Sequence, residues 1–138
     1  MIIDPLETMI TWLENSLKSV AGRVASKHRY GPADGWKKSE TGVTLHLDGG
    51  EPEIYAALAE PRLEIRIYAD DQIKVVDVWR DLVALSRTQA RFTVDTTKGK
   101  ALVQNFIQQS SLSLLYDEVL GMDMGVVFFG SKISEEDV

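Results

Sequence analysis

Residues 61–88 read PRLEIRIYADDQIKVVDVWRDLVALSRT, and within this stretch the hydrophobic period changes from two to about 3.6 residues. Every second residue from Leu63 to Ile67 is apolar, which predicts a strand with one face in a core and the other in water. Asp70 or Asp71 is then expected to cap a helix that runs to about Thr88. Its apolar face would carry Val75, Val76, Trp79, Leu82, Val83 and Leu85.

A second amphipathic helix is predicted near the N-terminus, from about Pro5 to Lys27. Asp4 suits the N-cap, Pro5 the first helical position, and Glu7 stands three residues after the cap as in a capping box. Gly22 either ends this helix early or permits close packing. The apolar stripe consists of Leu6, Met9, Ile10, Leu13, Leu17, Val20, Ala21 and Val24, with Trp12 near its edge.

Several shorter segments predict further strands. Val43–Leu47 alternates in polarity and is expected to end at Asp48-Gly49-Gly50, before an extended connection over residues 51–61. Arg91–Thr96 alternates too, and Ala101–Ser111 fits a helix or a strand, of which the strand is favoured. Leu120–Gly125 is predicted to be a loop and Gly125–Gly130 a short buried strand.

This order of elements predicts an α+β fold. Two helices would pack on one face of a mostly antiparallel sheet of four to five strands. The length of 138 residues favours one domain over residues 1–138, and the acidic tail at about 134–138 is expected to be flexible.

Composition excludes several classes of protein. The net charge of −6 argues against general binding to DNA or anionic membranes. The absence of cysteine excludes disulfide scaffolds and thiolate chemistry, and two histidines make a multi-histidine metal centre improbable. The sequence has neither a membrane-spanning apolar run nor the layout of a signal peptide, so a cytoplasmic protein is expected.

No catalytic or cofactor motif is recognisable, and we expect no enzyme activity, no cofactor and no metal. Asp70 and Asp71 could form an acid–base pair, but a helix N-terminus explains them better. Asp48 with Glu51 and Glu53 could offer oxygens to a metal, although a solvated turn is favoured. The remaining catalytic candidates are the histidines, His28 at a helix end and His46 on the polar face of a strand.

Charge is distributed unevenly along the chain. Between Arg23 and His46 five cations stand against two acids, whereas between Asp48 and Asp71 seven acids stand against two arginines. Opposite charge in two regions permits head-to-tail association into rings, unless the charges mix on the folded surface. The candidate residues for a partner or subunit interface are Trp36, Lys37 and Lys38 on a loop and Arg62, Glu64, Arg66 and Tyr68 on the wet face of a strand.

The whole pattern resembles one known family. The capped helix DPLETMITWL (residues 4–13), LDGGEPE (47–53) and RLEIRIYA (62–69) before a helix look like the small tail-terminator proteins of long-tailed bacteriophages, also called tail completion or minor tail protein U-type proteins. SSLSLLYD (110–117), before a final hydrophobic strand, is similar to the family's C-terminal hairpin. The polar run Gln104–Ser111 does not match the family's pattern.

The resemblance implies a structural protein of a phage or prophage tail. Such subunits form a homo-oligomeric ring, typically a hexamer, that caps the tail tube, stops its polymerisation and offers a surface for head joining. The implied partners are other copies of the chain, the tail tube protein and a head-proximal connector or stopper. No membrane and no sequence-specific nucleic acid is involved. The implied location is the head-proximal end of the virion tail, and the host cytoplasm during assembly.

Two alternatives remain open. One is another component of the head–tail neck, such as a connector or stopper. The other is a small enzyme or ligand-binding domain with a site near Asp70, Asp71 and His46, which a concave pocket joining those groups would favour.

Overall fold

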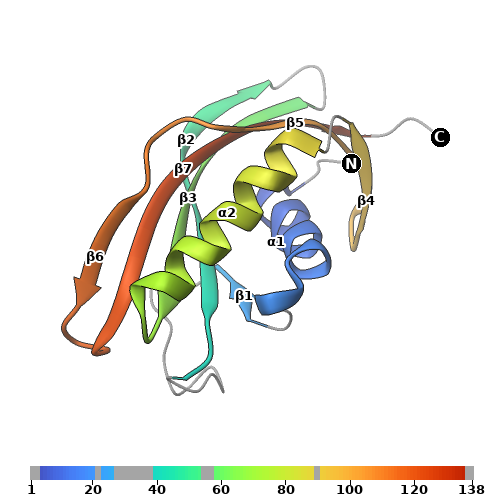
Figure 1. The fold of residues 1–138 in the computed structure, drawn as a ribbon. Coiled ribbons are helices and arrows are strands. Elements are labelled where there is room, and N and C mark those ends of the chain that lie inside the picture. Colours follow the sequence, from blue (N-terminus) through green and yellow to red (C-terminus); the bar gives the residue numbers. More distant parts are fainter. Residues whose placement is uncertain (1–3, 21–22, 27–38, 54–57, 89–90, 136–138) are drawn as a thin grey trace.

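The computed structural model describes residues 4–20, 23–26, 39–53, 58–88 and 91–135. Within these ranges, two helices lie on the concave side of a curled sheet of seven strands (Figure 1). The elements in chain order are α1 (Pro5–Ser16), the 3-10 turn η1 (Lys18–Val20), β1 (Val24–Ala25), β2 (Gly42–Glu53), β3 (Leu58–Ala69), α2 (Gln72–Thr88), β4 (Phe92–Thr96), β5 (Gly99–Gln108), β6 (Ser113–Asp117) and β7 (Met122–Glu135).

The sheet has the order β1-β2-β3-β7-β5-β4, and β6 also pairs with β7. The short β1 runs parallel to β2, and every other pair is antiparallel. The expected α+β class, with both helices on one face, is therefore confirmed. The sheet exceeds the expected four to five strands because β1 forms inside the predicted first helix and β6 forms inside residues 110–117.

Helix α1 begins as predicted but ends at Ser16, so the prediction of a helix to Lys27 is wrong. The Asp4 carboxylate accepts hydrogen bonds from the N–H groups of Leu6 and Glu7, at 2.9 and 3.3 Å. Leu17 leaves the helical conformation with φ −96° and ψ 85°. This turn keeps Leu17 and Val20 buried, and it lets β1 pair along β2 instead of continuing the helix axis.

Strands β2 and β3 are both longer than the alternating segments that predicted them. Asp48-Gly49-Gly50 does not end β2, because the strand shifts register between Leu47 and Gly50 and continues to Glu53. A bulge of this kind absorbs extra residues without ending the ladder. Most of the expected connection over residues 51–61 is therefore paired strand.

Helix α2 confirms the prediction of a helix to Thr88. Asp71 caps it, since its carboxylate accepts a hydrogen bond from Ile73 N at 2.7 Å and its carbonyl accepts one from Val75 N at 3.3 Å. Asp70 forms an ion pair with Lys74 at 2.7 Å.

Strands β5 and β6 follow one another along the same edge of β7 and form one interrupted strand. The pair Gln108–Phe129 ends the first segment and Ser113–Val126 begins the second, so the chain carries two extra residues on the β5–β6 side. Gln109 N donates to Phe128 O at 2.8 Å, and Ser110 Oγ accepts from Phe128 N at 2.9 Å. The strand favoured for 101–111 is confirmed up to Gln108.

Strand β7 is much longer than the expected Gly125–Gly130. The predicted loop at Leu120–Gly125 is confirmed only at Leu120 and Gly121, because β7 begins at Met122, directly after Gly121, whose φ is 65°. At the other end β7 includes Ser134 and Glu135, so these residues of the expected flexible tail are strand, and residues 136–138 lie outside the described part.

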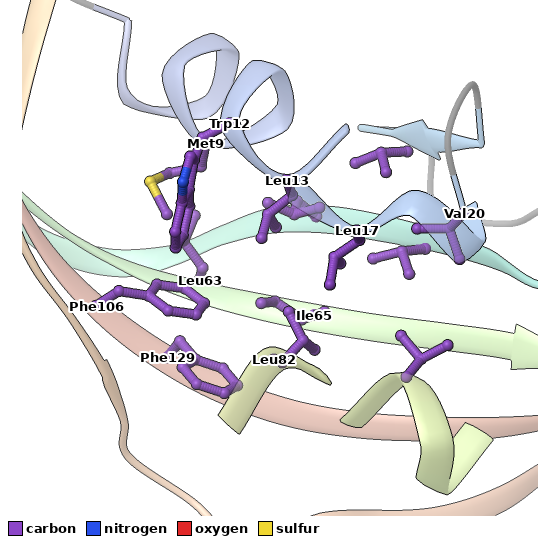
Figure 2. Packing of buried hydrophobic residues seen from close by; sticks show 14 of the residues in the cluster. Met9, Trp12, Leu13, Leu17, Val20, Leu63, Ile65, Leu82, Phe106 and Phe129 are labelled. Atoms are coloured by element: carbon purple, nitrogen blue, oxygen red, sulfur yellow. The ribbon is translucent and has the colours of Figure 1, made fainter. Parts of the chain in front are cut away.

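The hydrophobic core lies between the helices and the concave face of the sheet (Figure 2). Helix α1 contributes Met9, Trp12 and Leu13, and α2 contributes Val75, Val78 and Leu82. The Phe106 ring stacks on Phe129 at 4.4 Å and meets Trp12 edge-on at 4.9 Å. These aromatic contacts join α1 to both β5 and β7, so one core holds all the layers together.

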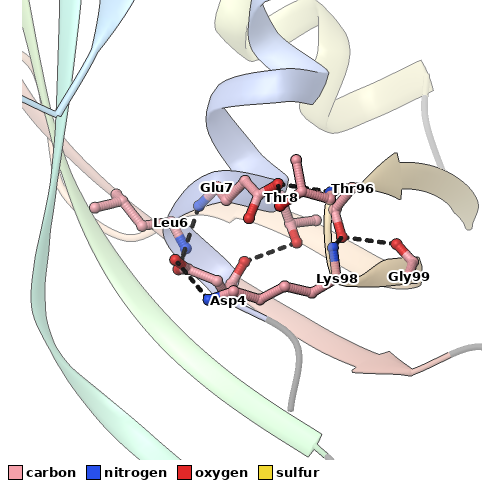
Figure 3. A network of polar contacts seen from close by, with 8 residues as sticks. Asp4, Leu6, Glu7, Thr8, Thr96, Lys98 and Gly99 are labelled. Atoms are coloured by element: carbon pink, nitrogen blue, oxygen red, sulfur yellow. Dashed lines mark hydrogen bonds and ion pairs between the residues drawn. The ribbon is translucent and has the colours of Figure 1, made fainter. Parts of the chain in front are cut away.

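Polar contacts fasten the first turn of α1 to the β4–β5 turn (Figure 3). The Glu7 carboxylate accepts hydrogen bonds from Thr97 N at 2.8 Å and from Thr97 Oγ1 at 2.7 Å. These bonds hold the pKa of Glu7 below its ordinary value, first through the hydroxyl and then through the backbone N–H. In the same cluster, the Lys98 ammonium nitrogen lies 3.8 Å from a carboxylate oxygen of Asp4.

The lowered pKa of Glu7 predicts a pH-dependent loss of stability for Glu7→Gln. The ionised carboxylate stabilises the fold fully above the unfolded pKa of about 4.3, and this contribution is lost as the pH falls through the lower folded pKa. We therefore expect Glu7→Gln to lower the unfolding free energy at pH 7, with the difference from the wild type shrinking at pH 3. Urea unfolding at both pH values measures this, with Glu14→Gln as control. An equal deficit at both pH values would contradict the assignment.

Gly125 permits the close approach of β7 to α2. A Cβ at this position would lie 2.6 Å from Val75 Cγ1 and 3.0 Å from Leu112 Cδ1. Gly125→Ala should therefore destabilise the fold by roughly 1–3 kcal/mol through overpacking. The same change should cost less in a Val75→Ala background, and a double-mutant cycle by urea unfolding measures this coupling. Additive effects would show that the two positions do not crowd each other.

Candidate assembly surface

The outer face of the sheet, opposite the helices, presents a polar row along β3. Arg62, Glu64 and Arg66 occupy alternate positions of this strand, as the sequence predicted. The Arg62 guanidinium lies 3.7 Å from the Asp48 carboxylate on β2 and 4.4 Å from the centre of the Phe128 ring on β7. The arginine thus bridges three strands of the sheet.

Glu64 and Arg66 form a half-buried ion pair in the same row. The Arg66 guanidinium donates a hydrogen bond to the Glu64 carboxylate. Desolvation alone would lower the pKa of Arg66, but hydrogen bonds to Glu64 and Tyr68 outweigh it and raise the pKa above the ordinary value. Arg66 is therefore a fixed cation on this face.

Tyr68 does not present the contact area expected of it. Its side chain has no exposed surface and forms a small second core with Met122, against which Ala25, Leu120 and Met124 pack. The period-two pattern placed Tyr68 on the outer face correctly. In the isolated chain Tyr68 is covered because the β6–β7 turn brings apolar side chains to this end of the outer face, and its expected contact with a partner stays a prediction.

Trp36, Lys37 and Lys38 lie outside the described residues, as does His28. Their expected role at an interface stays a prediction.

The structure does not bring Asp70, Asp71 and His46 together. His46 pairs with Glu64, six residues before Asp70, which corresponds to about 20 Å along the strand at 3.4 Å per residue. His46 Nε2 lies 3.3 Å from Thr44 Oγ1, and both aspartates serve the start of α2. These positions do not form the concave pocket that would favour an acid–base site.

A metal site is not apparent in the described part of the chain. No group of three or more His, Asp or Glu side chains there could hold an ion. Asp48, one of the three acids considered for a metal, is engaged with Arg62, and the side chains of Glu51 and Glu53 lie outside the described part.

The sequence pattern did not predict the exposed apolar surface of β6 and its following turn. Leu114, Leu115, Tyr116 and Val119 are 43%, 51%, 60% and 75% exposed. The run resembles a buried strand because three apolar residues are consecutive, but β6 is an edge strand and both of its faces reach solvent. A usable signal was the lack of lysine and proline, which commonly protect exposed edges.

Hollows flank β6 on both faces of the sheet. On the outer face, Arg66, Leu115, Tyr116 and Met124 line an open hollow of about 370 Å³. On the helix side, Leu114 and the first turns of α2 line a second of about 260 Å³, where Ile73 is 69% exposed. Both faces of this edge therefore carry hollows that apolar side chains of a protein partner could fill.

A third and larger hollow lies further along the outer face. It has a volume of about 560 Å³, and its lining includes Arg62, Ile107, Gly130 and Lys132. Lys132 is paired with Glu60 at 3.7 Å. The absence of a side chain at Gly130 leaves room that the Gln109 amide partly fills.

Comparison with known proteins adds no relative: no protein-family model matches the sequence, and no curated protein is significantly similar. Neither helix of the described part is long and apolar enough to cross a membrane.

The contrast between buried Tyr68 and exposed Tyr116 predicts very different losses of unfolding free energy for the same substitution to alanine. Tyr68→Ala removes a fully buried ring and should lower the unfolding free energy by about 3 kcal/mol. Tyr116→Ala removes an exposed ring and should change it by no more than about 0.5 kcal/mol. Urea unfolding of the two variants measures the difference. Equal destabilisation would contradict the assignment of Tyr68 to the core and Tyr116 to the surface.

Proposed function

We propose that the protein is a structural subunit of a phage or prophage tail. It forms a homo-oligomeric ring, a hexamer in the family it resembles, that caps the tail tube, stops tube polymerisation and offers a surface for head joining. It acts without a cofactor and without enzymatic chemistry. Its place is the head-proximal end of the tail.

The observation that carries this proposal is the exposed apolar edge at β6. Leu114, Leu115 and Tyr116 are consecutive and at least 43% exposed in the isolated chain. Burial of such apolar area stabilises an assembly by roughly 25 cal/mol per Å² removed from water, before the costs of association. Large apolar side chains exposed on both faces of an unprotected edge strand are typical of an edge that a partner covers.

The polar row on the outer face supports a second contact in the same assembly. Arg62 and Arg66 are cations held by Asp48 and Glu64. Charges fixed in this way give orientation and selectivity to a protein contact rather than large affinity. This face is a surface for the tube protein or the head-proximal partner, while β6 serves subunit contacts.

Tube-length measurement tests the proposal. Purified protein is added to polymerising tail tube subunits of the same phage or prophage, and tube lengths are measured by electron microscopy. We expect shorter tubes as the ratio of this protein to tube subunit increases. Leu115→Lys should lose the effect because it places a charge in the apolar edge. Leu47→Lys is the matched control, since Leu47 is also an exposed apolar strand residue but lies on β2 opposite Leu63, on the concave side and away from both β6 and the outer polar row.

The other outcomes are equally decisive. Labelled protein found at tube ends with no change in length would reject termination and favour the connector or stopper role. No binding to tubes and no effect on length would reject the tail function.

A further inference from the structure

We infer that neighbouring copies of this chain join by antiparallel pairing of β6 of one copy with β1 of the next, so that one sheet continues from subunit to subunit. This inference rests on the proposed ring and names the contact that builds it.

Strands β1 and β6 lie at opposite edges of the same part of the sheet, because the same rows of paired residues end in both of them. One row of paired residues crosses the sheet, and its members are Val24, Val43, Ile67, Gly125 and Leu114. The next row runs from Ala25 to Ser113 through Thr44, Arg66 and Val126. A neighbour placed beside β6 at the same height therefore presents its β1.

The strand directions suit a repeating contact. Strand β1 is parallel to β2, and the antiparallel steps from β2 through β3 and β7 leave β6 opposite in direction to β1. A rotation about an axis roughly parallel to the strands leaves their direction unchanged. It therefore brings β6 of one copy against β1 of the next as an antiparallel pair. The contact uses different surfaces on the two copies, and such contacts form rings when the rotation closes.

Each edge has pairing capacity in the described part of the chain. There, β6 pairs only with β7 and β1 pairs only with β2. The sequence of β6, SLLYD, contains none of the lysines or prolines that block edge-to-edge pairing. Added strands gain affinity from main-chain hydrogen bonds and specificity from pockets for alternate side chains, and such hollows flank β6.

Charge complementarity identifies a second copy as the occupant. Asp117 ends β6 and Glu118 follows it, whereas Arg23 directly precedes β1. Strands at the same level would set Leu114 opposite Val24 of the neighbour. An offset of two residues, a stagger that closed sheets commonly carry, keeps every side chain on its own face, places Leu115 opposite Ala25 and sets Asp117 opposite Arg23. The Arg23 side chain is held in position by Thr41 O at 2.7 Å and by Glu40 at 3.4 Å.

Cross-linking tests the contact directly, because the chain has no cysteine of its own. The full-length variant Ala25→Cys, Leu115→Cys is treated with a short bismaleimide, and the products are resolved by denaturing electrophoresis. Each copy then carries both halves of the contact, so we expect a ladder of covalent multimers that extends beyond the dimer. Each single variant should give no ladder. The matched control is Ala25→Cys, Ile107→Cys, which keeps one site and moves the other to an exposed position outside β6.

Native mass spectrometry of the wild type, run beside it, separates the two proposals. A ring with a ladder supports both. A ring without a ladder overturns the β6–β1 contact and leaves the proposed ring standing. Covalent dimers from Leu115→Cys alone would overturn the contact in favour of β6 pairing with itself. Neither a ring nor a ladder over the accessible concentration range would overturn the contact and count against the ring.

Discussion

The pairing of β3 with β7 is the constraint on which the rest of the structure depends. The two strands pair from Ala69–Asp123 to Leu58–Ser134, and their concave residues Leu63, Ile65, Ile67, Val127 and Phe129 are fully buried. Both helices cover this apolar surface, and β2, β5 and β6 attach to its two sides. The absence of a side chain at Gly125 lets α2 approach β7 closely. Because α1 and α2 both pack on this one apolar surface of the sheet, the folded chain offers neither helix another place to bury its apolar face.

The edges of the sheet follow from the same pairing. Strand β7 is longer than β5, and the chain resumes pairing along it as β6 after the break at residues 109–112. This places a strand of three exposed apolar residues at one edge, level with β1 at the other. A folded chain with two compatible edges and no covering helix at either described strand is suited to repeated addition of its own copies. The proposed tail ring is such an assembly.

The outer face has a different chemistry from the concave face because neither of the two described helices covers it. Its central positions hold ion pairs of Asp48 with Arg62 and of Glu64 with Arg66, while Tyr68 with Met122 forms a local apolar cluster near the β6–β7 turn. Partly exposed ion pairs of this kind contribute little to folding stability. Their value lies in presenting fixed charges to a partner, which fits a surface that must dock in one orientation.

The sequence by itself determined the α+β class, the cap at Asp4 and a cap at Asp70 or Asp71, because these depend on local periodicity and local hydrogen bonds. It also determined the strand at Leu63–Ile67 and the placement of Arg62, Glu64 and Arg66 on one face. Only the tertiary structure decided where α1 ends, since Leu17 and Val20 turn to fill a core made by distant strands. It also decided that Tyr68 is buried and that Leu114–Tyr116 are exposed. Alternation distinguishes the two faces of a strand, but what covers each face depends on which segments lie beside it, and that is set by pairing between residues far apart in the chain.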